Sequence, residues 1–183
     1  MATQVSAKFL KVTWDDLDDD RKVKDEVFGK IPAGDFNFAL MTDPQLGMFN
    51  SVVEEGDGQE YQEEYDNLHL TLKNLENISP KLDFAVILGD MVNQMPEGSI
   101  KENNPQMENH GAVHFQQAED FNALVSDSDF SVPLFVIPGN HDLGNNFNMT
   151  SFDIYYDEFG ADYFYFKTDD TAIIFICSQY RAR

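Results

Sequence analysis

Five polar side chains, each placed shortly after an apolar run, could together perform metal-dependent chemistry: Asp43 and Gln45 after the first run, Asp90 after the second, and Asn140 and His141 after the third. Carboxylate and amide oxygens without a thiolate favour a catalytic site for Mn²⁺, Mg²⁺, Fe²⁺ or Zn²⁺ over a structural zinc site. The two oxygens of Asp90 could bridge two such cations about 3.5 to 4 Å apart, a spacing that suits attack of a metal-bound hydroxide on phosphorus. His141 would then face the substrate, as a proton donor to the leaving oxygen or as an electrostatic partner of phosphate.

The three apolar runs predict the strands that would position these side chains. Residues 36–41 form a short β-type run that ends before Pro44. Residues 84–88 are continuously apolar, as in a strand covered on both faces of a parallel sheet, and residues 132–137 form the third run. Because ligands bind beyond the carboxyl ends of the strands in open α/β sheets, parallel strands would gather the polar side chains in one crevice.

Between the runs, apolar residues recur with the spacing of amphipathic helices. The expected helix faces consist of Tyr65, Leu68, Leu72 and Leu75; of Phe115, Ala118, Phe121, Asn122 and Val125; and of Phe152, Tyr155, Tyr156 and Phe159. Residues 163–167 and 171–177 then predict two strands that form a hairpin. Strands that alternate with helices predict an α/β fold with a mostly parallel sheet and right-handed crossovers.

The composition argues against several classes of protein. The chain has 12 Lys and Arg against 33 Asp and Glu, a formal net charge of −21, which argues against nucleic-acid or anionic-membrane partners. With 42% hydrophobic residues and 16 Phe, the chain is too apolar to be an acidic disordered tail. One cysteine permits no internal disulfide, and no apolar run approaches the roughly 18 residues of a membrane span. The start of the chain resembles neither a signal nor a transit sequence, so a cytoplasmic protein is expected.

The first 34 residues lack the alternation of strand and helix patterns that the rest of the chain shows. Five aspartates gather at residues 15–20, but a calcium loop is excluded because Arg21 stands at the turn glycine and Val27 at the closing glutamate. We therefore interpret residues 1–34 as an acidic, solvated leader that could be mobile, ahead of a domain at residues 35–183.

Each motif alone has an ordinary structural explanation. A Gly-Asp pair or an Asp-Pro pair after a strand is common turn chemistry, and Asn140 could be the N-cap of a helix. His69, His110 and His114 are expected to be surface or helix residues rather than ligands. The joint occurrence of the motifs, in order, at three successive strand ends favours a functional site.

The motifs also resemble those of a known family. The segments DPQLG at 43–47, GD at 89–90 and GNHD at 139–142 look like the D-x-H/Q, GD and GNH[DE] blocks of calcineurin-like metallophosphoesterases. The resemblance covers about residues 35–179 and implies the amino-terminal portion of that family's four-layer α/β/β/α sandwich. It further implies that two divalent cations, Mn, Fe, Zn or Mg, are the cofactors.

Carried over residue by residue, the resemblance implies that Asp43 and Gln45 bind the first metal, that Asp90 bridges and that Asn140 binds the second. His141 would assist the phosphoryl group, and Asn140 and His141 would both contact the substrate. Gln45 departs from the histidine common in the wider family. Asn93 stands where many protein phosphatases have an aspartate that orients the motif histidine.

The family continues with a second half that supplies an isolated histidine and a G-H-x-H block. No histidine follows His141 in this chain, so we expect the imidazole side of the site to be missing and turnover to be weak or absent.

Three functional hypotheses remain. The first is a dimetal phosphomonoester hydrolase of the serine/threonine phosphatase type, acting on a phosphorylated substrate such as a phosphoprotein. The second is a catalytically inactive truncated fragment that acts through partner binding, since a missing second sheet would leave apolar strand faces uncovered. The third is an acidic cation-binding module without catalysis. The oligomeric state is left open.

Overall fold

The computed structural model describes residues 9–25, 36–78, 80–96, 108–127, 130–144, 148–168 and 170–179. Parts of the expected leader (1–8 and 26–34), most of the loop expected at 93–109 and the last four residues of the chain lie outside this description.

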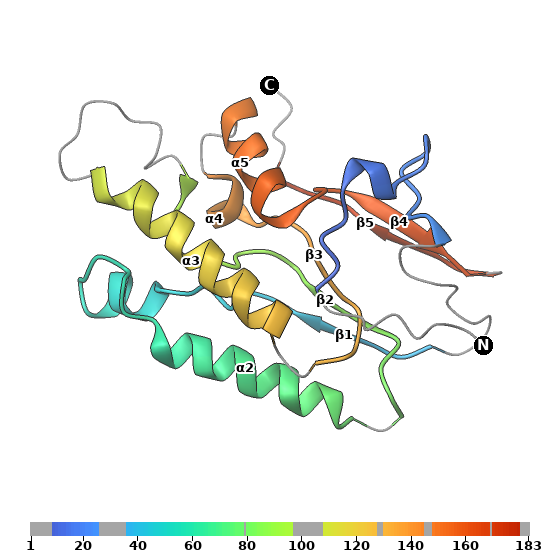
Figure 1. Ribbon diagram of the computed structural model, residues 1–183, viewed down its shortest axis with the longest axis horizontal. Helices are drawn as coiled ribbons and strands as arrows, with labels where there is room; N and C mark the ends of the chain where they lie inside the picture. The colour runs from blue at the N-terminus through green and yellow to red at the C-terminus, as the bar shows by residue number, and fades with distance from the viewer. Residues whose placement is uncertain are drawn as a thin grey trace.

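A three-stranded parallel sheet forms the centre of the molecule (Figure 1). Its strands are β1 (Phe38–Met41), β2 (Phe84–Ile87) and β3 (Leu134–Val136), in the order β1-β2-β3. Phe38 is paired with Phe84, and Ala85 with Leu134. All four residues of β2 are buried, which explains why its sequence is apolar without alternation.

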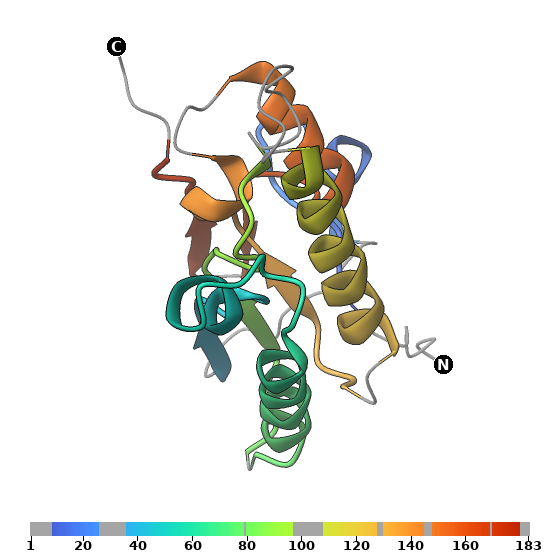
Figure 2. The ribbon, with the colours of Figure 1, turned by 90° about the vertical axis from the view of Figure 1, so that its left-hand side faces the viewer.

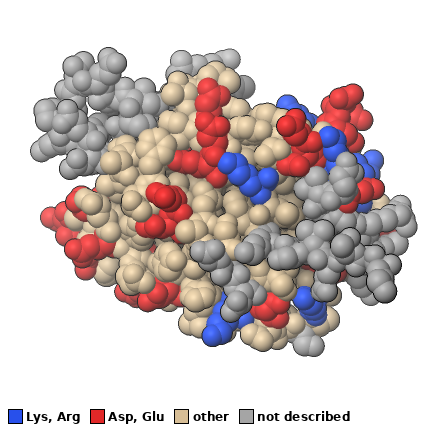
Figure 3. Space-filling view, viewed as in Figure 1, with Lys and Arg blue, Asp and Glu red and all other residues tan. Residues whose placement is uncertain are grey.

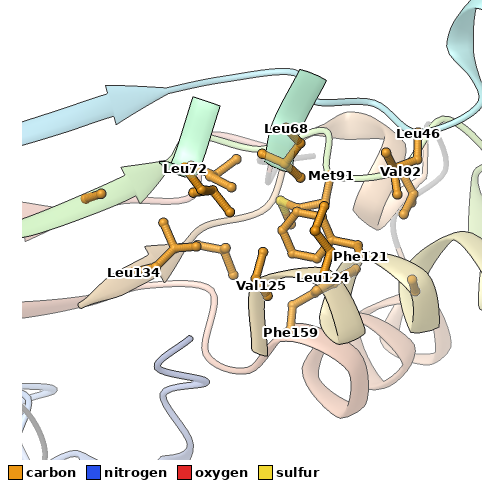
Figure 4. Close-up of a cluster of buried hydrophobic side chains, with 14 of the residues drawn as sticks. Leu46, Leu68, Leu72, Met91, Val92, Phe121, Leu124, Val125, Leu134 and Phe159 are labelled. Atoms are coloured by element: carbon orange, nitrogen blue, oxygen red, sulfur yellow. The ribbon is translucent and has the colours of Figure 1, made fainter. Parts of the chain in front are cut away.

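Helices cover one face of this sheet. They are α2 (Gln62–Glu76), α3 (Glu108–Asp127) and α5 (Met149–Phe159), and a π-helical segment η2 (Phe49–Val53) and a single turn α4 (Asn140–Leu143) lie in the connections. Figure 2 shows α2 and α3 on the side of the sheet away from the last two strands. The main core fills the space between sheet and helices, and Figure 4 shows its labelled side chains, including Leu72, Phe121 and Val125.

A hairpin covers the other face. Strands β4 (Phe164–Lys167) and β5 (Ala172–Phe175) pair antiparallel, as expected, and pack a second core against β2 and β3. This core is mostly aromatic and includes Phe84, Phe135, Phe164, Phe166 and Phe175. The layers are therefore helices, sheet and hairpin, which confirms the expected amino-terminal portion of an α/β/β/α sandwich.

The described part of the expected leader packs in part against the domain. Residues 9–25 include the 3₁₀ turn η1 (Trp14–Asp16), and Val12, Leu17 and Val23 are buried in the second core. The aspartates at 18–20 nevertheless point into solvent. Spaced apolar residues thus contact the core, while the charged residues between them stay exposed.

The expected face of helix α2 (Gln62–Glu76) is confirmed, since Leu68 and Leu72 are buried and Tyr65 and Leu75 pack against the main core. The expected face of α3 is shifted at one position. In α3, Ala118, Phe121 and Val125 are buried as expected, but Phe115 is 47% exposed. The interior positions of that turn belong to His114 and Gln117. Polar residues thus occupy places that the apolar pattern alone did not assign to the core.

The surface shows acidic side chains scattered over the face of Figure 3, with basic side chains at fewer places. Within the described ranges, no helix is both long enough and apolar enough to cross a membrane.

Candidate metal and phosphate site

The loops after β1 and β2 run side by side beyond the sheet. The N–H of Asp43 donates to the carbonyl of Gly89 at 3.1 Å, and the N–H of Gln45 donates to the carbonyl of Asp90 at 3.0 Å. A parallel bridge between Leu46 and Val92 continues the pairing. The parallel topology therefore brings together the first two predicted motifs, as the strand order required.

The turns after β2 and β3 touch through their glycines. A Cβ on Gly139 would lie 2.1 Å from Oδ1 of Asp90, and a Cβ on Gly89 would lie 2.5 Å from the nitrogen of Gly139. Gly89 also has a φ of +98°, which disfavours other residues. Only glycine at both positions lets the third motif approach Asp90 this closely.

Asp142 joins these two turns from inside the protein. Its carboxylate is fully buried and accepts hydrogen bonds from the N–H groups of Asp90 (2.7 Å), Met91 (2.9 Å) and Gly139 (2.8 Å). Burial raises the pKa of Asp142 to about 7, although the three N–H donors oppose that shift. The last residue of the GNHD motif thus acts as a clamp on the loop backbones.

Asp90 lies where the three motifs meet. Its Oδ1 accepts a hydrogen bond of 2.9 Å from the backbone N–H of His141. Burial raises the pKa of Asp90, and the neighbouring carboxyl of Asp43 raises it further, while the His141 N–H opposes both. The Asp43 carboxyl therefore lies beside that of Asp90, and a divalent cation bound between them would offset their negative charge.

Three of the predicted metal ligands have strained backbones. The φ angles are +54° at Asp43, +42° at Gln45 and +53° at Asp90, all in the left-handed region that non-glycine residues rarely adopt. Such outliers cluster at functional sites because the surrounding structure holds them there. Their coincidence with the predicted ligands supports a functional role for these loops.

The ring of His141 is held by a backbone carbonyl. Its Nδ1 donates to the carbonyl oxygen of Asn93, since a carbonyl can only accept. The side chain of Asn93 meanwhile accepts a long hydrogen bond of 3.4 Å from Nε2 of Gln45. Asn93, which lacks the carboxylate expected of an orienting residue, therefore contacts two of the predicted site residues.

The donor set fits hard divalent cations. Asp43 and Asp90 supply adjacent carboxyls, and the amide oxygens of Gln45 and of Asn140, the first residue of α4, are of the same hard type. Across the residues that the structure describes, no cluster of three or more His, Cys, Asp or Glu side chains could hold a metal ion. The candidate ligands are thus two neighbouring carboxyls and the amides of Gln45 and Asn140.

A hollow of about 340 Å³ adjoins Asp43 on the side of α2. Its wall carries several polar side chains, namely Thr42, Asp43, Glu64, Asn67 and Thr71. Sequence reasoning missed the structural roles of three residues near the site. These residues are Asp142, which holds the loop backbones, and the buried His114 and Gln117 of α3. Only the role of Asp142 could have been suspected from the sequence, because this residue ends the GNHD motif.

The amino-acid sequence is similar to those of known proteins. The model of the family "Calcineurin-like phosphoesterase" matches residues 36–179. Among curated relatives, Serine/threonine-protein phosphatase CPPED1 of Danio rerio is 30% identical over 152 residues, 81% of this chain and 45% of the relative. The proteins of the same name from Pongo abelii and Homo sapiens are 27% and 26% identical over 150 residues, 80% of this chain and 44% of theirs. The chain thus spans less than half the length of these relatives, and no solved structure matches it significantly. With the family model matching most of its length, the chain belongs to the calcineurin-like phosphoesterase family.

Proposed function

We propose that this chain provides the carboxylate side of a two-metal site for phosphomonoester hydrolysis. The observation that carries the proposal is the meeting of the Asp43 and Asp90 carboxyls, with the backbone of His141 hydrogen-bonded to Asp90. Asp43 and Gln45 would hold one divalent cation, Asn140 the second, and Asp90 both. When bound, such cations would activate water as the nucleophile and neutralise charge on the phosphoryl oxygens.

His141 would act on the leaving group. Because Nδ1 donates to Asn93, Nε2 is the ring nitrogen left to donate a proton to the leaving oxygen or to bind a phosphoryl oxygen. The amide of Asn140 would bind the same phosphoryl group from the start of α4. This arrangement assigns binding and proton transfer to neighbouring residues of one motif.

The proposed substrate is a phosphoserine or phosphothreonine in a protein. The support comes from the relatives, whose name is serine/threonine-protein phosphatase, and from the open polar hollow beside Asp43. The proposal includes a cytoplasmic location, which agrees with a single cysteine and no disulfide.

Hydrolysis of p-nitrophenyl phosphate with added Mn²⁺ tests the proposal. We expect slow, chelator-sensitive hydrolysis that Asp90→Asn reduces by at least about 100-fold, because the shared ligand loses its charge. Asp19→Asn, which removes an exposed carboxylate of the aspartate run, is the matched control and should leave the rate unchanged. Hydrolysis that persists in Asp90→Asn would refute the proposed site.

A second candidate function is partner binding without catalysis. It is favoured by large apolar side chains that are exposed on β1 and β5 or directly after β5, namely Phe38, Leu40, Ile174 and Ile176. Light scattering of the chain and of Leu40→Lys with Ile174→Lys tests this candidate. Loss of self-association or partner capture in the double variant, with hydrolysis absent from the wild type, would favour it over catalysis.

A further inference from the structure

Gln117 is a polar residue placed deep in the main core, on α3. Its side chain is fully buried, and both ends of its amide bind backbone groups. Oε1 accepts from the N–H of Gln94 at 2.9 Å, and Nε2 donates to the carbonyl of Gly58 at 2.7 Å. An amide buried in this way is costly unless both ends are satisfied, so these contacts fix the loop at Gln94 firmly.

One peptide group links Gln117 to His141, because each side chain forms a hydrogen bond to one end of it. The N–H of Gln94 and the carbonyl of Asn93 belong to the same planar peptide unit. That carbonyl accepts the Nδ1 proton of His141. A hydrogen bond at the N–H end therefore sets the direction of the carbonyl at the other end and polarises it as an acceptor.

His114 holds the next carbonyl of the same loop. Its Nδ1 lies 2.5 Å from the carbonyl oxygen of Gln94, and its Nε2 lies 2.9 Å from Oε2 of Glu158 on α5. Both partners are acceptors, which suits a ring protonated on both nitrogens. His114 and Gln117 are neighbours on one face of α3, so this helix holds both backbone polar groups of Gln94.

We propose that Gln117 is a positioning residue for His141, acting through the peptide group that joins Asn93 to Gln94, and that His114 supports it by holding the following carbonyl. The inference rests on the proposed function, in which His141 acts on the phosphoryl group. A carbonyl held in this way keeps the proton on Nδ1 and leaves Nε2 facing the substrate. It performs the orienting task that a carboxylate at Asn93 would otherwise perform.

The ¹⁵N chemical shifts of the two ring nitrogens of His141, measured at pH 8.5 in the metal-free chain, test the inference directly. His141→Gln assigns the signals. The wild type should carry the proton on Nδ1. Gln117→Met, of similar length but without the amide, should shift the population toward the Nε2–H form, and the Gln94 amide should exchange faster.

Two further variants separate positioning from mere packing. Gln116→Met makes the same chemical change at an exposed position of the same helix and should leave the His141 tautomer unchanged. Gln117→Glu keeps an acceptor for the Gln94 N–H and replaces the donor to Gly58 by a carboxylate oxygen, so it should retain the Nδ1–H form. A wild type with its proton on Nε2, or a Gln117→Met variant with the wild-type tautomer, would overturn the inference. The first of these outcomes does not depend on whether any variant folds.

Hydrolysis of p-nitrophenyl phosphate distinguishes this inference from the proposed function. If the chain hydrolyses the substrate, Gln117→Met should lower kcat by about 10-fold or more and change KM by less than about 2-fold. A tautomer that shifts in Gln117→Met while no protein hydrolyses the substrate would uphold the positioning and refute the function. Hydrolysis by the wild type, together with a wild-type tautomer in Gln117→Met, would support the proposed function and refute the positioning role.

Discussion

The carboxylate of Asp142 accepts a hydrogen bond of 2.7 Å from the backbone N–H of Asp90, although 52 positions separate the two residues in the chain. The same carboxylate binds Met91 and Gly139, so one buried side chain ties the end of β2 to the end of β3. The geometry of the candidate site therefore depends on a residue that does not itself face the substrate.

Replacement of Asp142 should destabilise the fold. Asp142→Ala leaves three N–H groups without their acceptor in a buried place, which should cost about 2 to 4 kcal/mol in the free energy of unfolding. Urea denaturation measures this change. Asp153→Ala, at an exposed position of α5, should change it by less than about 0.5 kcal/mol. Equal effects of the two variants would contradict the clamp role.

The ion pair of His114 and Glu158 should make stability depend on pH. Burial by itself lowers the pKa of His114, but the hydrogen bond to Glu158 and its negative charge outweigh burial and leave the pKa raised. A group with a raised pKa in the folded state contributes stability below its unfolded pKa of about 6.5, and this contribution is lost as the pH rises through the folded pKa.

Glu158→Gln tests that dependence. The variant should lose about 1 to 3 kcal/mol at pH 6 and clearly less at pH 9, where His114 no longer carries the charge. Urea denaturation at the two pH values provides the comparison, with Glu119→Gln, exposed on α3, as the control. A loss of equal size at both pH values would show that the charge of His114 does not matter.

Strand β5 should open more easily than β2. It pairs with β4 in a two-stranded hairpin, and Ile174 and Ile176 are 62% and 68% exposed, whereas β2 is buried between two neighbours. Hydrogen exchange should therefore show amides at 171–177 exchanging orders of magnitude faster than those of β2. Uniformly strong protection of both strands in a monomer would contradict this prediction.

The parts of the fold that follow from local patterns could be predicted. The three apolar runs became β1, β2 and β3 because a strand buried on both faces must be apolar throughout, and their parallel order brought Asp43, Asp90 and His141 together. The hairpin at 164–175 followed from two short apolar segments around a polar turn. The assignment of metal and substrate roles to individual side chains stays a prediction.

The remaining features depend on contacts between distant segments. Apolar periodicity cannot show that His114 and Gln117 are buried, since their burial depends on acceptors supplied by the loops at Gln94 and Gly58. Apolar periodicity also cannot show that Val12 and Leu17, which lie in an aspartate-rich segment, are buried. The surface that they cover comes from β2, β3 and the hairpin. The burial of a polar residue can be explained only when its hydrogen-bond partners are known.

Binding of Mn²⁺, measured by titration calorimetry, tests most directly whether the strand ends form a metal site. The chain and its Asp19→Asn variant should bind Mn²⁺ with the same affinity, whereas Asp43→Asn and Asp90→Asn should each weaken binding by at least about 10-fold, since each removes one charged ligand. If binding survives both of these substitutions and is lost when the aspartates at 15–20 are replaced by asparagine, the cation site lies in the amino-terminal segment and the proposed site is wrong.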